Sequence, residues 1–356
     1  MQGNAVNEAP DGMILGTEVE YLICEEVSSP LAGSSATLRS RGSHEALAGV
    51  LNSIPAEYLL CDEPLNPRYN GFILQNGGRL YIDGSFLEYA TPECLNVRQL
   101  LAYEKAGDLI AGAGLKAYCH KTATTLRLYK MISDVEPGGE IPGYHENYGL
   151  RQDRYFNLFM ENFWPREVIR RVLIPFLVTR QLFAGAGALV SGGTDVHFEL
   201  SQRAMWIETV FNYTASHRRP ILQLKRPDLS EKYLRVHISC GDPNIADWST
   251  FLKIGTTAVM LACLGQGVFS DVDLELTDSI QAFKTVSRKG SVALNLKAGG
   301  QISAIDIQET LLQKVRGVED RIVRPRDLEW EPITEVWGDT LRELQRYPWK
   351  SLANGV

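Results

Sequence analysis

GTEVEY, residues 16–21, is the stretch that decides how this sequence folds. Alternation of this kind predicts a β-strand, in which residues two apart lie on the same face. Glu18 and Glu20 then project from one face, while the residues between and beside them face the other. Two neighbouring carboxylates repel each other unless positive charge lies between them. The pattern therefore leaves two interpretations, a solvent-exposed strand face or a pair of oxygen ligands for Mg²⁺ or Mn²⁺.

Length and composition are those of an ordinary folded protein, with 356 residues of which 44% are apolar and 22% charged. The net charge of −7 argues against nucleic acid as a partner. No window approaches the ~20 apolar residues of a membrane span, and we expect no secretory signal. The six cysteines form no C-x-x-C pair, which excludes the usual zinc spacings and predicts a reducing, cytoplasmic location.

Glycine and proline separate short strand-like segments from longer helical ones, which predicts an α+β fold on an antiparallel or mixed sheet. Strands are expected at residues 13–24, 71–75, 79–83, 124–131, 196–201 and 233–240. Apolar spacing predicts helices at residues 97–112, 167–184 and 247–265, the last apolar nearly all round and therefore buried. Pro175 predicts a kink or two abutting helices in the second of these. A further helix is expected around residues 333–344.

Two segments besides GTEVEY place polar side chains on a strand face. In RLYID, residues 79–83, Asp83 ends a strand on its polar face, although a surface aspartate before a turn is the plain alternative. In YLRVHIS, residues 233–239, Arg235 and His237 share one face. A lone inward histidine is more often a core residue than a ligand. The arginine two positions away favours a site that binds a metal and an anion together.

These residue types suit phosphoryl transfer. Carboxylates hold Mg²⁺, which neutralises triphosphate oxygens, while an arginine stabilises the transferring group and an aspartate handles a proton or acts as a nucleophile. The sequence has no G-x-x-x-x-G-K-[ST], so a P-loop would not hold the phosphates. Nucleotide held by metal and arginines on an antiparallel sheet is the arrangement of glutamine synthetase-like enzymes.

Six segments resemble, in the same order, segments of the Pup ligase and Pup deamidase (depupylase) family of actinobacteria. They are GTEVEY (16–21), NGGRLYIDGSFLEYATPEC (76–94), GYHENY (143–148), LIPFLVTRQLFAGAG (173–187), FELSQRA (198–204) and YLRVHISCGDPNIADWSTFLKIGTTAVML (233–261). The resemblance implies a glutamine synthetase-like fold, with a curved, mainly antiparallel sheet backed by helices. We expect the catalytic domain to span residues 13–317, and the sequence on either side predicts a flexible N-terminus (1–12) and a helical C-terminal tail (318–356).

The resemblance also implies roles for individual residues. The implied metal ligands are Glu18, Glu20, Glu88, His145 and His237. Asp83 falls at the family's catalytic aspartate, a base in the ligase and a proposed nucleophile in the deamidase. Arg203 and Arg235 would contact the phosphates of ATP, which would bind together with Mg²⁺.

The leading hypothesis is an ATP-dependent carboxylate–amine ligase that works through an acyl phosphate. Its partners would be a carboxylate donor (a glutamate-ended peptide, a Pup-like protein or a small molecule) and an amine acceptor. A deamidase-like amide or isopeptide hydrolase is the alternative, because GTEVEY is closer to the deamidase while FLVTRQL is closer to the ligase. A catalytically idle relative is a third class, and the retained carboxylates argue against it.

Three segments depart from the family pattern. Phe86-Leu87 replaces a His-Pro pair, Met131-Ile132 follows Lys130 in place of a polar run, and residues 223–228 (QLKRPD) differ from another polar run. Since these segments face substrate in the family, we expect a less polar acceptor pocket and poor activity on Pup-tagged protein. The deamidase's long insertion and the family's C-terminal domain are both expected to be absent.

Overall fold

The computed structural model describes residues 12–27, 37–41, 43–61, 71–130, 141–159, 166–191, 196–214, 218–225 and 232–347. Within this part of the chain the main feature is a sheet of ten strands. Its strands are β1 (Ile14–Val27), β2 (Thr37–Arg41), β3 (Gly71–Ile73), β4 (Arg79–Asp83), β5 (Phe86–Ala90), β6 (Leu126–Tyr129), β7 (Tyr144–Arg151), β10 (Thr209–Asn212), β11 (Pro220–Leu224) and β12 (Tyr233–Ile238). Two small hairpins are formed by β8 (Ala188–Ser191) with β9 (Val196–Glu199), and by β13 (Ala293–Asn295) with β14 (Gln301–Ser303).

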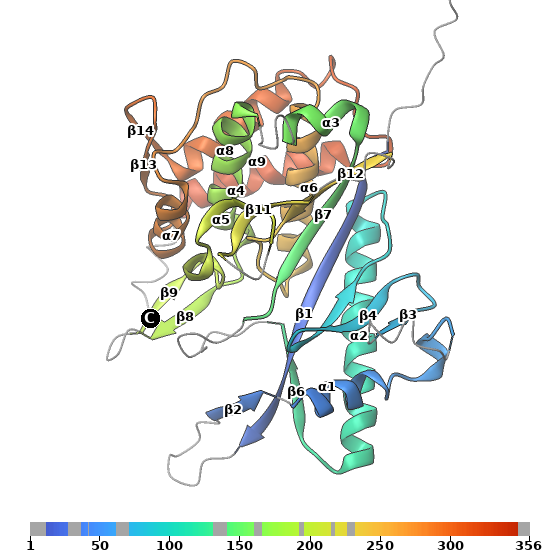
Figure 1. Ribbon diagram of the computed structural model, residues 1–356. Helices are drawn as coiled ribbons and strands as arrows, with labels where there is room; N and C mark the ends of the chain where they lie inside the picture. Colours follow the sequence, from blue (N-terminus) through green and yellow to red (C-terminus); the bar gives the residue numbers. More distant parts are fainter. Residues whose placement is uncertain are drawn as a thin grey trace, which may run out of the picture.

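The sheet runs in the order β10-β11-β12-β7-β1-β5-β4-β3, with the long strand β1 crossing its middle (Figure 1). β2 and β6 pair with the far end of β1. Neighbouring strands are antiparallel, except that β10 and β11 are parallel. The predicted α+β fold with a mainly antiparallel sheet is therefore confirmed.

Helices cover one face of this sheet in two groups. α1 and α2 pack against β1, β4 and β5, while α4, α6, α8 and α9 share a larger buried cluster with β7, β11 and β12. In Figure 1, α2 runs beside β1 and the larger block lies at the upper left. The helices are α1 (His44–Leu51), α2 (Val97–Thr122), α3 (Gln152–Phe159), α4 (Ile174–Thr179), α5 (Gln181–Ala184), α6 (Asp247–Leu264), α7 (Ser279–Lys289), α8 (Ala304–Arg316) and α9 (Trp330–Arg346).

The alternation predicted for the strands decides which face the helices cover. Val19 and Tyr21 of β1 are buried against α2, and the three apolar residues of β12 join the larger cluster. Glu18 and Glu20 lie on the opposite face, as period-two geometry requires. Burial of one apolar face thus leaves the charged side chains of several strands together on the other face.

Several described strands are absent from the sequence-based prediction, namely β2, β5, β7, β8, β10, β11, β13 and β14, and of these β5 and β7 contribute to the site described below. The polar run from Tyr144 to Asn147 after a glycine-rich segment predicts a capped turn, yet β7 is a central strand between β1 and β12. The alternation was hidden because Glu146 is charged although it is fully buried on the helix side. β5 was not predicted either, since four of its five residues are buried and show no alternation. The composition of residues 133–146 and 225–231 predicts loops, and most of each segment lies outside the described residues.

The second difference concerns α2, which continues ten residues beyond the predicted end at residue 112. Gly112 and Gly114 suggested a stop, because glycine lowers helix stability. Gly114 instead allows close packing: a Cβ atom there would lie 2.3 Å from Cδ1 of Ile54. The helix ends where Ala123 adopts a left-handed conformation, with φ of 55°.

Three helix predictions are confirmed. The predicted break near Pro175 is the junction between a π-helical turn (Ile169–Leu173) and α4, and α5 follows after Arg180. α6 is buried nearly all round, and α9 covers the helix expected around residues 333–344. Among the described residues, no helix combines the length and apolarity needed to cross a membrane. The domain boundary at residue 317 stays a prediction.

Candidate active site

The candidate site lies on the face of the sheet that the helices leave uncovered. Strand register brings its residues together: Glu20 is opposite Glu88, Glu18 is opposite His145, and the next pair joins Asn147 to His237. Residues opposite each other in an antiparallel pair share a face with their Cβ atoms about 4.5–5.5 Å apart. Five adjacent strands, β12, β7, β1, β5 and β4, thus build one polar surface from distant parts of the chain.

Two overlapping groups of side chains have the geometry to hold metal ions. One consists of Glu18, His145 and His237, and the other of Glu20, Glu88 and His145. In each group the potential ligand atoms lie within 4.8 Å of one another. The structure therefore places together all five residues that the resemblance implied as ligands, and His145 is common to both groups. We refer to these five side chains as the carboxylate–histidine cluster.

Burial without compensating charge shifts the pKa values across the cluster. Burial raises the pKa of Glu88 to about 9, with the Glu18 and Glu20 carboxylates adding to the effect, and burial also raises the pKa of Glu20. Burial lowers the pKa of His237 well below its usual value. For Glu18 burial is outweighed by His145 and Arg235, which hold its pKa well below the usual range. The raised pKa values of Glu20 and Glu88 show that these two carboxylates lack sufficient positive charge nearby, which a bound cation would supply.

Two buried ligand atoms of the cluster have no hydrogen-bond partner among the described residues. They are Oε2 of Glu88 and Nε2 of His237. Nδ1 of His237 lies 2.8 Å from Oδ1 of Asn147 and 3.2 Å from Nη2 of Arg235, whereas Nε2 has neither contact and is available to a ligand. An unsatisfied buried polar atom costs about 1–3 kcal/mol. Carboxylate and imidazole donors with lone pairs directed inward fit a divalent ion such as Mg²⁺ or Mn²⁺.

Gly143 supports the cluster through its backbone. Its N–H donates to Oε2 of Glu20 at 2.5 Å. A Cβ atom at this position would lie 2.8 Å from Nε2 of His145 and 2.9 Å from Oε1 of Glu20. A side chain at this position would displace both ligand groups, and no local pattern reveals this apart from the place of Gly143 before HENY.

The two arginines implied by the resemblance lie near different parts of the cluster. Arg235 donates to Oε1 of Glu18 at 2.6 Å and to Oδ1 of Asn147 at 2.7 Å, and its side chain is 46% exposed. Arg203 is buried; its Nη1 donates to the carbonyl oxygen of Pro142 at 2.7 Å, and its Nε has no partner among the described residues. Burial lowers the pKa of Arg203, which the nearby Glu20 opposes.

Asp83 ends β4 at the edge of the cluster and is exposed. It precedes a two-residue turn in which Gly84 has φ of 55°, and its negative charge contributes to the raised pKa values of Glu20 and Glu88. The aspartate is therefore both a surface residue before a turn and a neighbour of the cluster. Tyr81, on the same strand face, hydrogen-bonds Glu88 and was not singled out from the sequence.

A hollow of about 290 Å³ adjoins the cluster on the side of Glu18 and Arg235. Its lining comes from β1, β5, β7 and β12 and from the segment after β5. The lining residues are Ile14, Leu15, Gly16, Thr17, Glu18, Ala90, Thr91, Pro92, Glu93, Asn147, Gly149 and Arg235. A ligand in this hollow would lie next to the metal-binding groups.

The segments that depart from the family pattern are only partly described. Phe86 is opposite Asp83 and packs with Leu22 and Cys24, on the same sheet face as the cluster. Leu87 points the other way into the core formed with α2, so it does not face substrate. Residues 131–132 and 226–228 lie outside the described residues.

A model of the family described as Pup-ligase protein matches residues 14–354. The chain belongs to this family. The family predicted from the six sequence segments is thereby confirmed.

The chain is similar to relatives that are named depupylase and to relatives that are named Pup–protein ligase. A depupylase of Acidothermus cellulolyticus is 36% identical over 284 residues, which cover 78% of this chain and 54% of the relative. A Pup–protein ligase of Mycobacterium leprae is 34% identical over 289 residues, covering 78% of this chain and 60% of the relative. The chain thus spans little more than half the length of these curated relatives.

Two solved structures of the Pup ligase PafA resemble the fold. PafA in complex with the ubiquitin-like protein Pup has a TM-score of 0.74 and 28% identity, covering 96% of this chain and 66% of that chain. PafA with ADP has a TM-score of 0.64 and 31% identity, covering 80% of this chain and 62% of that chain. The predicted fold class is confirmed by this likeness.

Proposed function

We propose that the protein is an ATP- and Mg²⁺-dependent carboxylate–amine ligase of the Pup ligase type. The observation that carries the proposal is the carboxylate–histidine cluster with Arg235 beside Glu18 and Arg203 beside Glu20. Such a site suits a triphosphate, because metal ions and arginines together neutralise its oxygens. The ADP complex of PafA supports a nucleotide ligand for this family member.

The proposed ligands of Mg²⁺ are the five side chains of the cluster, and the bound metal would neutralise phosphate charge. Arg235 and Arg203 would bind the phosphates from two sides. We place the nucleotide in the hollow that adjoins Glu18 and Arg235. Such a ligand would account for the buried atoms of Glu88 and His237 that have no partner among the described residues.

The chemistry would take two steps. An oxygen of the donor carboxylate attacks the γ-phosphorus of ATP, ADP leaves, and an acyl phosphate forms. The nitrogen of an amine then attacks the acyl carbon, phosphate leaves, and Asp83 accepts the proton released by the amine. The exposed position of Asp83 at the edge of the cluster supports this role, because an amine could reach it from solvent.

For the substrates, we propose a glutamate-ended donor and an amine acceptor. The complex of PafA with Pup supports a Pup-like protein as the donor. Phe86 opposite Asp83 supports an acceptor side less polar than the family's, with low activity on Pup-tagged protein. The cysteine pattern supports a cytoplasmic location.

Hydrolysis of an amide or isopeptide bond is the second candidate function. The 36% identity to a depupylase favours it. Such a reaction proceeds downhill without net consumption of ATP, so the two candidates differ in a measurable product.

The test is incubation of the protein with ATP, Mg²⁺, a glutamate-ended donor and a set of amines, Pup included among the donors. ADP and new masses should appear together, in equal amounts. Ammonia released from a glutamine-ended donor, without ADP, would overturn the ligase proposal and favour the hydrolase.

A further inference from the structure

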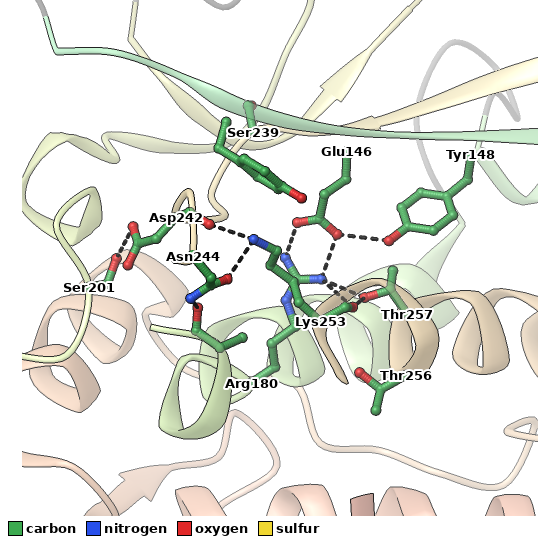
Figure 2. A network of polar contacts seen from close by, with 12 residues as sticks. Glu146, Tyr148, Arg180, Ser201, Ser239, Asp242, Asn244, Lys253, Thr256 and Thr257 are labelled. Carbon is green, nitrogen blue, oxygen red and sulfur yellow. Dashed lines mark hydrogen bonds and ion pairs between the residues drawn. The ribbon is translucent and has the colours of Figure 1, made fainter. Parts of the chain in front are cut away.

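A second set of charged residues lies on the helix side of the sheet, where the proposed chemistry does not use it (Figure 2). Arg180 donates to both carboxylate oxygens of Glu146, and the hydroxyl of Tyr148 donates to the same group at 2.8 Å. Nζ of Lys253 donates to the backbone oxygen of Asp242 at 2.5 Å and to Oδ1 of Asn244 at 2.7 Å. All six residues are at most 3% exposed.

The carboxylate of Asp242 is the most heavily bonded group in this set. Its Oδ1 accepts from Oγ of Ser201 at 3.0 Å and from the backbone N–H of Arg203 at 3.3 Å. Its Oδ2 accepts from the backbone N–H groups of Ala186 at 3.0 Å and Gln202 at 3.2 Å. One buried carboxylate therefore holds the side chain of Ser201 and the backbone N–H groups of residues 202 and 203, and joins them to the segment after α5.

Those hydrogen bonds lead directly to the candidate site. The side chain of Arg203 donates to the carbonyl oxygen of Pro142 at 2.7 Å, and the next residue, Gly143, donates to Glu20 at 2.5 Å. A continuous series of contacts thus joins Asp242 to a member of the carboxylate–histidine cluster. Oγ of Ser201 adds a second contact within the series, since it accepts from the N–H of Arg203 at 3.2 Å.

We propose that Asp242 is a positioning residue for Arg203, holding the backbone of residues 201–203 so that the buried guanidinium faces Glu20 and the phosphate of a bound nucleotide. The phosphate part of this inference rests on the proposed function. The unpartnered Nε of Arg203 is the donor that the anion would meet.

The arrangement requires a carboxylate at position 242. An aspartate accepts from all four donors, whereas an asparagine has one acceptor oxygen and directs an NH₂ group at two of them. In the asparagine variant, the side-chain NH₂ group would face other hydrogen-bond donors with no acceptor between them. Because the site is buried, this mismatch would break the hydrogen bonds to the backbone. Lys253 holds the carbonyl of the same residue and keeps the loop in place.

The experiment compares Asp242→Asn with Arg203→Ala, with the double variant and with Gln308→Ala. Gln308 is the matched control because it is fully buried and donates two hydrogen bonds, to Phe176 and Thr179, away from residues 201–203. Two quantities are measured in the full chain: ATP affinity with Mg²⁺ by calorimetry, and the rate at which phenylglyoxal modifies Arg203 without nucleotide, followed by mass spectrometry.

We expect Asp242→Asn to weaken ATP binding about tenfold or more, and to add less than about twofold when Arg203 is already alanine. Phenylglyoxal should modify Arg203 faster in Asp242→Asn than in the wild type. Gln308→Ala should change neither the ATP affinity nor the modification rate of Arg203, even if its melting temperature falls as far as that of Asp242→Asn. If Asp242→Asn does not fold, Ser201→Ala replaces it in the same comparison, with smaller effects in the same direction.

The proposal would be overturned if Asp242→Asn lowered ATP affinity by the same factor in the wild-type and the Arg203→Ala backgrounds. It would also be overturned if phenylglyoxal modified Arg203 in Asp242→Asn at the wild-type rate. A wild-type protein that binds no ATP would overturn the proposed function alone. In that case the phenylglyoxal comparison, which needs no nucleotide, decides whether Asp242 positions Arg203.

Discussion

The two faces of the sheet carry similar charged residues in opposite states of pairing. On the helix side, Glu146 is bound by Arg180 and Tyr148, and Asp242 accepts four hydrogen bonds. On the other side, Glu88 and His237 each keep a buried atom without a partner among the described residues. The difference teaches how to separate structural charge from functional charge: protein groups complete the first set, while the second set requires something that the chain does not supply.

Loss of chemistry should be the largest single effect. Asp83→Asn preserves the shape of the side chain but removes the proton acceptor, and a lost general base typically costs about 10²–10⁴-fold in rate. ATP affinity should stay near the wild-type value, since Asp83 lies at the edge of the cluster. Single-turnover rates and calorimetric ATP titrations measure the two quantities. Wild-type turnover in this variant would remove Asp83 from the mechanism.

Breaking the ion pair of Glu146 and Arg180, on the helix side of the sheet, should lower the free energy of unfolding. Glu146→Gln leaves the guanidinium of Arg180 buried with a neutral partner, and removal of one member of a buried ion pair typically costs about 3–5 kcal/mol. Urea unfolding measures this loss. Replacing both partners, in Glu146→Gln with Arg180→Met, should recover part of it. A loss below about 1 kcal/mol in the single variant would contradict the assignment of this face to stability.

Neutralising Glu88, on the sheet face opposite the helices, should change the stability of the protein only slightly. Unlike the loss of Glu146, it should favour the folded state at higher pH. The pKa of Glu88 is raised from its ordinary value to about 9, so the folded state holds a proton that the unfolded state has lost. Without metal, this group makes the protein less stable as pH rises from about 5 towards 9. Glu88→Gln removes the titration, so its melting temperature should fall less than that of the wild type over this interval.

Mg²⁺ is the control for the Glu88→Gln comparison. The ion stabilises the carboxylate form, so it should reduce the pH dependence of the wild type more than that of Glu88→Gln, in which Glu20 still titrates. Identical melting curves of the two proteins at all pH values, with and without Mg²⁺, would contradict the burial of Glu88 as an unpaired carboxyl group.

Much of the site could be predicted from the sequence, because strand alternation is a local property. Glu18 and Glu20 in β1, and Arg235 and His237 in β12, were placed on the correct faces from their spacing alone. The resemblance supplied the remaining ligand positions, and their roles as ligands stay proposals.

The parts that could not be predicted depend on distant partners. β7 was missed because Glu146 looks like a surface residue until Arg180, 34 positions away, is seen beside it. The contributions of Asn147 and Gly143 likewise depend on strand pairing that no local pattern reveals. α2 was predicted too short because the contact that requires Gly114 comes from Ile54.

The central claim is that the unpaired face of the sheet holds metal for a nucleotide. Glu20→Ala tests it most directly, because Glu20 is buried in the cluster and its loss removes one ligand without breaking a protein ion pair. Calorimetric titration of the wild type and of Glu20→Ala with ATP, with and without Mg²⁺, should show Mg²⁺-dependent binding in the wild type and its loss in the folded variant. Unchanged ATP affinity in Glu20→Ala would contradict the claim.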